Sequence, residues 1–344
     1  MTAGRGNGAA RAPARCPATR QCAPARHRIA PGAATAWFLW LLWLLIGWAA
    51  PGQGQDRGLR DAGVLVGVDW LEARLGRDGL VVLDVHERPV QYFTQGHVAG
   101  AVQVRRASDL ADPTSPELTG FPDRARFRET LRKWGIEDNS EIVIYDDTDT
   151  ARASRLWLLL RLHGFASQQV KLLDGGLRAW QQGHALARHD VQPARGQVSL
   201  NGAAPPMLVD WRFVYERIVT HRDDRFVLVD TRAPREYTGE LAVGAARGGH
   251  IPGALNIPAR DGVNADGTWK ARPDKAFVYA FLPFDKTIVL YGGTGDGASL
   301  AAAQLASLGY RRLRILDGGW GFWGNRLLLP VVQGARPYDA ASQR

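Results

Sequence analysis

The chain is poor in cysteine. It has two in 344 residues, Cys16 and Cys22, and none follows them. Residues 23–344 therefore have no disulfide framework, no thiolate metal site and no cysteine nucleophile. The sequence also lacks a run of Lys or Arg that could form a basic stripe, so nothing in it indicates nucleic acid as a partner.

The N-terminus has the charge and hydropathy pattern of a secretory leader. The apolar stretch 37–48 is preceded by six Arg and no acidic residue. Small residues at Gly47 and Ala49 fit the positions that a signal peptidase reads, so we predict that residues 1–50 are a signal peptide and the protein is periplasmic or secreted. The alternative is an inner-membrane anchor with the domains outside, because residues 33–50 are uncharged. Membrane contact is expected only through this segment.

Cleavage would change the net charge. Loss of residues 1–50 takes the formal balance from 43 − 34 = +9 to 37 − 34 = +3. A charge near zero does not indicate a polyanionic partner.

Four short patterns occur twice in the same order. Their offsets range from 143 residues (172 to 315) to 153 residues (96 to 249). The paired patterns are VLD at 82–84 and LVD at 228–230, GHVAGA at 96–101 and GHIPGA at 249–254, IVIY at 142–145 and IVLY at 288–291, and LLDGG at 172–176 and ILDGG at 315–319. Such self-similarity indicates a duplication. We therefore predict two domains, residues 60–185 and 208–330, joined by a linker over 186–207 that is rich in Pro, Gly and polar residues.

One glycine-rich turn has the shape of an anion site. An apolar strand, 287–291, should be connected to a helix over 298–308. The six connecting residues are Gly292, Gly293, Thr294, Gly295, Asp296 and Gly297. Glycines there allow backbone N–H groups to converge near the positive end of the helix, which favours a small anion. A plain tight turn is the alternative.

These motifs resemble those of the tandem rhodaneses, the thiosulfate/3-mercaptopyruvate sulfurtransferase family. The resemblance covers about residues 60–330 and rests on Asp230-Thr231-Arg232, Tyr237, GHIPGALNIP at 249–258 and LDGGW at 316–320. It implies an α/β fold in which each half is a parallel β-sheet of about five strands flanked by helices. The alternation of strands and helices independently indicates a doubly wound α/β fold, with ligands at the carboxyl ends of the strands.

The chain departs from this family at the nucleophile. In an active rhodanese the residue after the Tyr291 strand is a cysteine that carries sulfur as a persulfide, whereas here it is Gly292. Glycine supplies no nucleophile, so no catalytic residue is assigned. Active family members often place a cation in the loop that here holds Asp296, and some thiosulfate-binding members place a basic residue at the position of Glu236. A carboxylate would repel an anionic sulfur donor by about 4 kcal/mol at about 4 Å and intermediate dielectric.

The turn after Tyr145 is acidic, with Asp146, Asp147 and Asp149. An aspartate at 146 matches the non-catalytic first domain of tandem rhodaneses. We expect a solvated turn paired with Arg152 or Arg155. A metal held by the three carboxylates is the alternative, although no metal and no cofactor is assigned. The residues expected to line the cleft are Asp230, Arg232, Glu236, Asp146 and Asp147.

Two histidines, His97 and His250, occupy the same repeat position. A catalytic histidine is needed only once, so their recurrence favours a structural hydrogen bond.

The sequence thus predicts an exported rhodanese-like protein without sulfurtransferase activity, in a binding or accessory role toward a small anion or a protein partner. The alternative is an active sulfurtransferase, from thiosulfate to a thiophilic acceptor, that uses a partner or acceptor thiol, or a metal-assisted activity near Asp146. Whether the protein is an enzyme stays open at this point, since fold does not imply function.

Overall fold

The computed structural model describes residues 63–111, 120–201 and 206–338. The predicted leader, residues 1–50, lies outside them. Both repeat halves belong to one compact unit, Gly52–Arg344. Within the described ranges, no helix combines the length and the apolar character needed to cross a bilayer.

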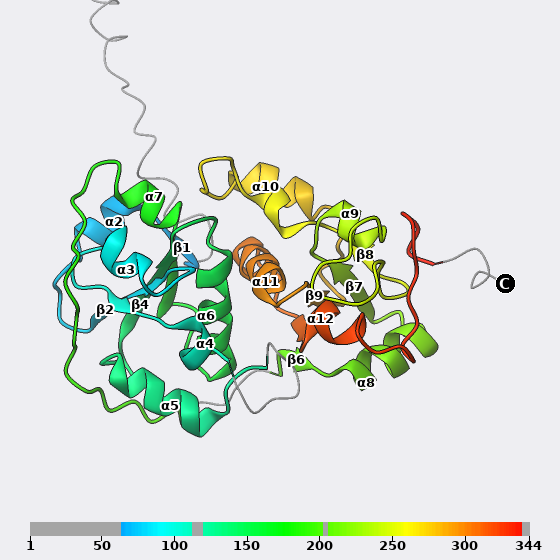
Figure 1. Ribbon diagram of the computed structural model, residues 1–344, viewed down its shortest axis with the longest axis horizontal. Coiled ribbons are helices and arrows are strands. Elements are labelled where there is room, and N and C mark those ends of the chain that lie inside the picture. The colour runs from blue at the N-terminus through cyan, green and yellow to red at the C-terminus, as the bar shows by residue number, and fades with distance from the viewer. Residues whose placement is uncertain (1–62, 112–119, 202–205, 339–344) are drawn as a thin grey trace, which may run out of the picture. The chain divides into compact units, whose positions relative to one another are not determined.

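The first half alternates strands with helices, as the periodicity predicts (Figure 1). Its strands are β1 (Leu65–Val66), β2 (Leu80–Val85), β3 (Val102–Gln103), β4 (Glu141–Asp146) and β5 (Val170–Leu173). Its helices are α2 (Val68–Glu72), α3 (Gln91–Thr94), α4 (Arg106–Asp109), α5 (Arg124–Lys133), α6 (Ala151–Leu162) and α7 (Gly176–Trp180).

The second half repeats this order. Its strands are β6 (Leu208–Val209), β7 (Phe226–Asp230), β8 (Leu255–Asn256), β9 (Thr287–Tyr291) and β10 (Leu313–Leu316). Its helical segments are α8 (Trp211–Phe213), the π-helical η1 (Val214–Thr220), α9 (Pro234–Tyr237), the 3-10 turn η2 (Ala259–Gly262), α10 (Arg272–Val278), α11 (Asp296–Leu308) and α12 (Gly319–Trp323).

Each half has one parallel five-stranded sheet, which confirms the predicted fold class. The strand orders are β1-β5-β4-β2-β3 and β6-β10-β9-β7-β8, the same topology twice. The registers also repeat: Asp84 pairs with Tyr145 at the carboxyl ends of β2 and β4, and Asp230 pairs with Tyr291 at those of β7 and β9. Ligand sites are expected at this edge of such sheets.

Helices α6 and α11 pack against each other and join the two halves. Five consecutive residues of α6, 156–160, are buried, as are all six residues 298–303 of α11. A helix buried on every side cannot be amphipathic, and the alanines of α11 allow its neighbours to approach closely. One hydrophobic cluster consequently includes core residues of both halves.

The predicted linker packs on the first half. Val198 and Leu200 are buried in the shared hydrophobic cluster. Arg132 of α5 donates a hydrogen bond from Nε to the Val198 carbonyl at 3.2 Å, and the Ser199 hydroxyl donates to Asp138 at 2.6 Å. The exact domain limits remain a prediction.

The glycine-rich turn is shorter than predicted. Helix α11 begins at Asp296, so Asp296 and Gly297 form its first turn instead of the loop. Of the four glycines at 292–297 only Gly295 has a positive φ, 92°. A Cβ at Gly292 or Gly297 would come within 3.1 or 3.2 Å of Thr231 Oγ1, whereas a Cβ at Gly293 would meet nothing within 4 Å.

Candidate functional site

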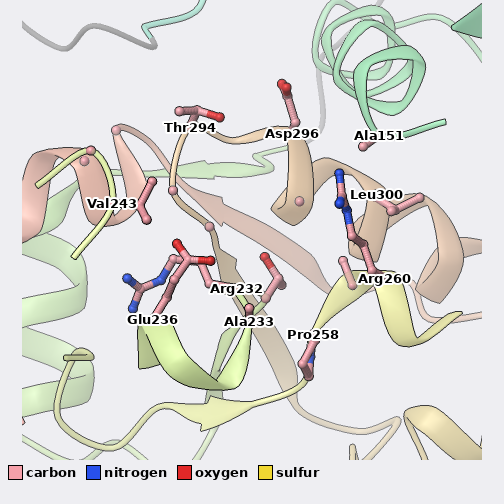
Figure 2. A pocket seen from close by; sticks show the side chains of 18 of the residues that line it. Ala151, Arg232, Ala233, Glu236, Val243, Pro258, Arg260, Thr294, Asp296 and Leu300 are labelled. Atoms are coloured by element: carbon pink, nitrogen blue, oxygen red, sulfur yellow. The ribbon is translucent and has the colours of Figure 1, made fainter. Parts of the chain in front are cut away.

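The carboxyl ends of β7 and β9 open into a pocket of about 780 Å³ (Figure 2). In the second half its walls come from the turn after β7, the loop after β9, η2 and α12. The first half contributes the turn between β4 and α6, through Asp149, Ala151 and Arg152. The pocket is therefore built by both repeats.

Helix α12 holds the loop after β9 in place. The carbonyl of Gly292 accepts the Trp320 N–H at 2.8 Å, and the carbonyl of Gly293 accepts the Gly321 N–H at 3.2 Å. These bonds satisfy the two carbonyls, whereas the first N–H groups of α11 have no partner within the helix.

Close backbone contacts show that positions 146 and 292 are equivalent. Gly319 has φ 48°, and a Cβ there would lie 2.5 Å from the carbonyl oxygen of Gly292. Gly176 has φ 54°, and its Cβ would lie 2.4 Å from the carbonyl oxygen of Asp146. Only glycine fits either place, since both the backbone conformation and the contact exclude a side chain.

In the first half, a carboxylate fills the N–H cradle. Asp146 is fully buried. Its Oδ1 accepts the N–H groups of Thr148 at 2.9 Å and Thr150 at 3.0 Å, and its Oδ2 accepts those of Arg152 at 3.0 Å and Ala153 at 3.1 Å. Burial raises the pKa of Asp146, and the hydrogen bonds from Ala153 and Thr148 act in the opposite direction. Asp146 therefore lies inside its own loop. It does not line the pocket, where the sequence had led us to expect it.

In the second half no side chain fills the equivalent position, and Gly292 and Gly297 line the pocket. The N–H groups of Gly297 and Ala298 donate to no acceptor among the residues that the structure describes. A Cβ added at Gly292 would lie 3.3 Å from the Ala298 nitrogen and 3.1 Å from Thr231 Oγ1. Gly292 does not have a positive φ, so its backbone is one that any residue can adopt.

The Asp296 carboxylate is neutralised by the first half. Arg106 donates from Nη2 to Asp296 Oδ2 at 2.6 Å. Arg155 lies nearby and donates to the Thr294 carbonyl at 3.4 Å. In Figure 2 the Asp296 carboxyl group points away from Arg232 and Glu236. The predicted repulsion of an anion by Asp296 is therefore weakened by a cation that the sequence alone did not place there.

Asp230 and Arg232 form a buried ion pair at the end of β7. Arg232 donates to both carboxylate oxygens of Asp230 and to the Gly249 carbonyl, and it lies over the Trp320 ring at 4.4 Å. Burial lowers the pKa of Arg232, but the hydrogen bonds and charge of Asp230 outweigh it and raise that pKa. Arg232 lines the pocket, whereas Asp230 lies beneath it.

Glu236 projects from α9 and lines the pocket, as expected from the sequence. It is half-buried, and no ion pair involves it within the described part of the chain. It therefore adds a negative charge to the pocket wall.

The acidic turn is paired with arginines. Asp147 binds Arg152 at 3.2 Å, and Asp149 binds Arg260 of the second half at 2.8 Å. Asp149 lines the pocket and Asp147 does not. No cluster of three His, Cys, Asp or Glu in the described ranges could hold a metal ion.

The two repeated histidines have structural roles, as predicted. Each ring bonds through Nδ1 to a tyrosine carbonyl, His97 to Tyr92 at 3.0 Å and His250 to Tyr237 at 2.9 Å. Each also stacks on that tyrosine with ring centroids 3.7 Å apart. Neither histidine lines the pocket.

Several residues of the site were missed from the sequence. Arg106 and Arg260 each contact a residue of the other half. Arg155, which was expected to pair with the acidic turn, instead donates to the Thr294 carbonyl of the other half. Thr231 bonds the Tyr291 carbonyl at 2.9 Å and fills the space beside Gly292. No local pattern identifies the partners of these arginines, because the partners are brought near only by the packing of the halves.

Comparisons with known proteins agree with this architecture. The family model described as rhodanese-like domain matches residues 67–183 and 215–326. The sulfur carrier protein TtuD of Thermus thermophilus is 32% identical over 284 residues, which cover 79% of this chain and 97% of that protein. The thiosulfate sulfurtransferase of Corynebacterium glutamicum is 33% identical over 288 residues, with coverages of 78% and 90%.

Solved structures show the same fold. SseA from Escherichia coli, described among the 3-mercaptopyruvate sulfotransferases, superposes with a TM-score of 0.65 at 27% identity, covering 74% of this chain and 98% of that one. The anaerobic ergothioneine biosynthesis enzyme from Chlorobium limicola has a TM-score of 0.69 at 24% identity, which shows the fold alone, covering 81% and 72%. The family model matches both halves, and relatives more than 30% identical cover most of the chain. The chain therefore belongs to the rhodanese family and carries two rhodanese-like domains in tandem.

Proposed function

We propose that this protein is an exported member of the sulfurtransferase family that binds a ligand without transferring sulfur through a persulfide of its own. The observation that carries the proposal is Gly292, which occupies the position between β9 and α11 where the family's cysteine would stand. Its Cβ would lie 3.3 Å from the Ala298 N–H, the environment that stabilises a thiolate. The chain has no thiol after Cys22 to replace it.

The surrounding site supports a binding role. The pocket is open, its N–H cradle has no acceptor among the described residues, and Arg106 offsets the charge of Asp296. These features suit a small anion. In its second form, the proposed role is the binding of a protein partner that presents an anionic group to this pocket.

Export belongs to this proposal as well. Its support is the leader-like pattern of residues 1–50, read as a signal peptide or as an inner-membrane anchor. Residues 23–344 contain no cysteine, so this part of the chain has no thiol to be oxidised and no disulfide to form in an oxidising compartment.

The alternative is sulfur transfer with a thiol supplied by a partner or acceptor. The intact cradle favours it, because the N–H groups could stabilise a bound sulfur anion. The relatives named as a sulfur carrier and a thiosulfate sulfurtransferase give it context. A metal-assisted reaction has less support, since the oxygens of Asp146 already accept four N–H bonds.

The test is thiocyanate release from thiosulfate and cyanide by the full chain, compared with a Gly292→Cys variant. Both carry Cys16→Ser and Cys22→Ser, so that position 292 holds the only thiol. We expect no release above the buffer blank for the parent and measurable release for Gly292→Cys. A second variant, Thr231→Ala with Gly292→Cys, removes the hydroxyl that lies 3.1 Å from the new Cβ.

Release by the cysteine-free parent would contradict the proposal, because sulfur would then pass without a protein thiol. Failure of both cysteine variants, with folding intact by circular dichroism, would show that more than the nucleophile has been lost from the site.

A further inference from the structure

The second half exposes three phenylalanines outside the pocket, in a segment that starts on α10. Phe277, in the last turn of that helix, is 81% exposed, and Phe281 and Phe284 are 89% and 66% exposed. Helix α10 lies beside α11, and the chain continues from Phe284 into β9 (Figure 1). Single exposed apolar residues are common, but three phenylalanines within eight residues indicate a contact surface. We call these three side chains the aromatic surface.

Basic residues adjoin the aromatic surface. Phe284 stacks on Tyr310 with ring centroids 4.1 Å apart, which brings it beside Arg311 and Arg312 at the start of β10. Lys286 follows it at the start of β9. The side chains of Lys286 and Arg311 have no ion pair or hydrogen bond within the described ranges, so their charges are available to a partner.

The cations continue along the amino ends of β7, β9 and β10, the edge of the sheet opposite the pocket. A cavity of about 540 Å³ at this edge is lined by the cations Arg217, Arg225, Lys286, Arg312 and Arg314 and by the carboxylates Asp224 and Asp285. Even when Asp223 is included, which binds Arg217 and Arg225, the cations outnumber the carboxylates by five to three. This edge of the second half therefore has an excess of positive charge.

The first half lacks this combination of residues. Strands β4 and β9 are equivalent at an offset of 146 residues (145 to 291). At this offset Gly135 and Asp138 take the places of the second and third phenylalanine, and Ser140 takes the place of Lys286. The fold therefore forms without aromatic residues or a cation at these positions, which indicates that they serve another purpose.

In the first half the same place is covered by the linker. A Cβ at Gly135 would lie 2.9 Å from the Ala194 carbonyl oxygen, and the Ser199 hydroxyl donates to Asp138 at 2.6 Å. In the second half, no segment that the structure describes buries the equivalent phenylalanines. The face that is polar and covered in one repeat is thus apolar and exposed in the other.

We propose that the aromatic surface and the cations beside it dock the folded protein on a membrane that contains anionic lipids. Phenylalanines insert at the boundary between headgroups and acyl chains, and Lys or Arg side chains next to them bind the negatively charged headgroups. The excess of cations also selects against a second copy of this chain, because an isologous contact would bring like charges together. This inference does not depend on the chemistry of the pocket. It adds a membrane contact of the folded part to the one predicted for residues 1–50.

The experiment uses a fluorophore that responds to its environment, nitrobenzoxadiazole, on the full chain. Cys16→Ser, Cys22→Ser and Ala280→Cys leave one thiol, at an exposed position between two of the phenylalanines. Vesicles consist of phosphatidylcholine alone or with an equal amount of phosphatidylglycerol. We expect the emission to rise and shift to the blue with the anionic vesicles, and less so at high salt. The control label is Gln168→Cys, at an exposed position on the equivalent edge of the first half, where we expect no change.

One pair of substitutions tests the apolar contribution. In the labelled chain, Phe277→Ser with Phe281→Ser should raise the lipid concentration at half-maximal response at least about tenfold. Both side chains are exposed, so thermal unfolding should be unchanged. The matched control is Leu327→Ser with Leu328→Ser, at side chains that are 78% and 98% exposed in another loop, and it should respond like the parent.

A second pair tests the charges. Lys286→Gln with Arg311→Gln removes two cations without breaking an ion pair of the described residues. Binding to the anionic vesicles should weaken about fivefold for each charge removed.

Four results would overturn the inference: no response of the label at 280, an equal response of the label at 168, an equal response to phosphatidylcholine alone, or a lipid titration that the phenylalanine substitutions leave unchanged. If the first result were accompanied by a concentration-dependent dimer in sedimentation that the phenylalanine substitutions abolish, the aromatic surface would be assigned to a second copy of the chain.

Discussion

Arg106 Nη2 donates a hydrogen bond to Asp296 Oδ2 across 2.6 Å, which ties α4 of the first half to the first turn of α11 in the second. Both side chains are partly buried, with exposed fractions of 30% and 18%. A carboxylate at the start of a helix is favourable for the helix dipole but unfavourable for a bound anion, and the guanidinium offsets the second effect.

Loss of this cation should weaken both the interface between the halves and the anion site. We expect Arg106→Ala to lower the free energy of unfolding by about 1 kcal/mol at low salt, and less at high salt. Urea unfolding measures this. In a double-mutant cycle, Arg106→Ala should lower the free energy of unfolding only slightly when Asp296→Ala is already present. An undiminished decrease in that background would show that Arg106 acts through another partner.

Asp146→Asn should destabilise the first half more than its small change in shape suggests. The amide oxygen can accept only one pair of N–H groups, and the amide nitrogen faces the other pair. We expect a loss of about 2–3 kcal/mol in the free energy of unfolding by urea. The matched control is Asp147→Asn, whose carboxylate bonds the partly exposed Arg152. Equal effects of the two substitutions would contradict the structural role of Asp146.

Gly319→Ala tests the close approach of α12 to the loop after β9. Gly309 is the control, because it also has a positive φ, 103°, but a Cβ there meets nothing within 4 Å. Gly309→Ala should cost about 1–2 kcal/mol from backbone conformation alone. Gly319→Ala should cost clearly more, since its Cβ would lie 2.5 Å from the Gly292 carbonyl oxygen. Thermal unfolding compares the two, and similar losses would mean that α12 moves freely.

His163 should make stability fall in mild acid. Burial, together with the charge of Arg124, lowers the pKa of His163 from 6.5 to about 4. The unfolded chain then binds the proton more readily than the folded chain, so the free energy of unfolding decreases as the pH drops from about 6.5 to about 4. His163→Gln should flatten this part of the pH profile. His221→Gln, at an exposed histidine, is the control. An unchanged slope in His163→Gln would contradict the effect of burial.

The fold was predictable because its signals are local and repeated. The apolar strands that carry Asp84 and Asp230 and the strands that precede the turns into α6 and α11 each appear twice in the sequence, and the structure has the same sheet twice. The glycine-rich turn was also visible, although its helix begins at Asp296, earlier than helix propensity indicates.

The site was only partly predictable, because its electrostatics depend on contacts between the halves. Arg106 and Asp296 lie 190 positions apart, and nothing near either residue indicates the other. The self-contained cradle around Asp146 was read as a solvated acidic turn, since a run of carboxylates does not show which one turns inward. The two differ in their partners, because the Asp146 carboxylate accepts four backbone N–H groups whereas that of Asp147 bonds Arg152.

The shared hydrophobic cluster around α6 and α11 makes the repeats thermodynamically interdependent. Cutting the chain at the linker would expose the surface of α6 that α11 covers, and with it apolar side chains of the shared cluster. Calorimetry of the intact protein should therefore show one cooperative transition where two independent modules would melt separately. A single half of this chain is therefore not expected to fold by itself.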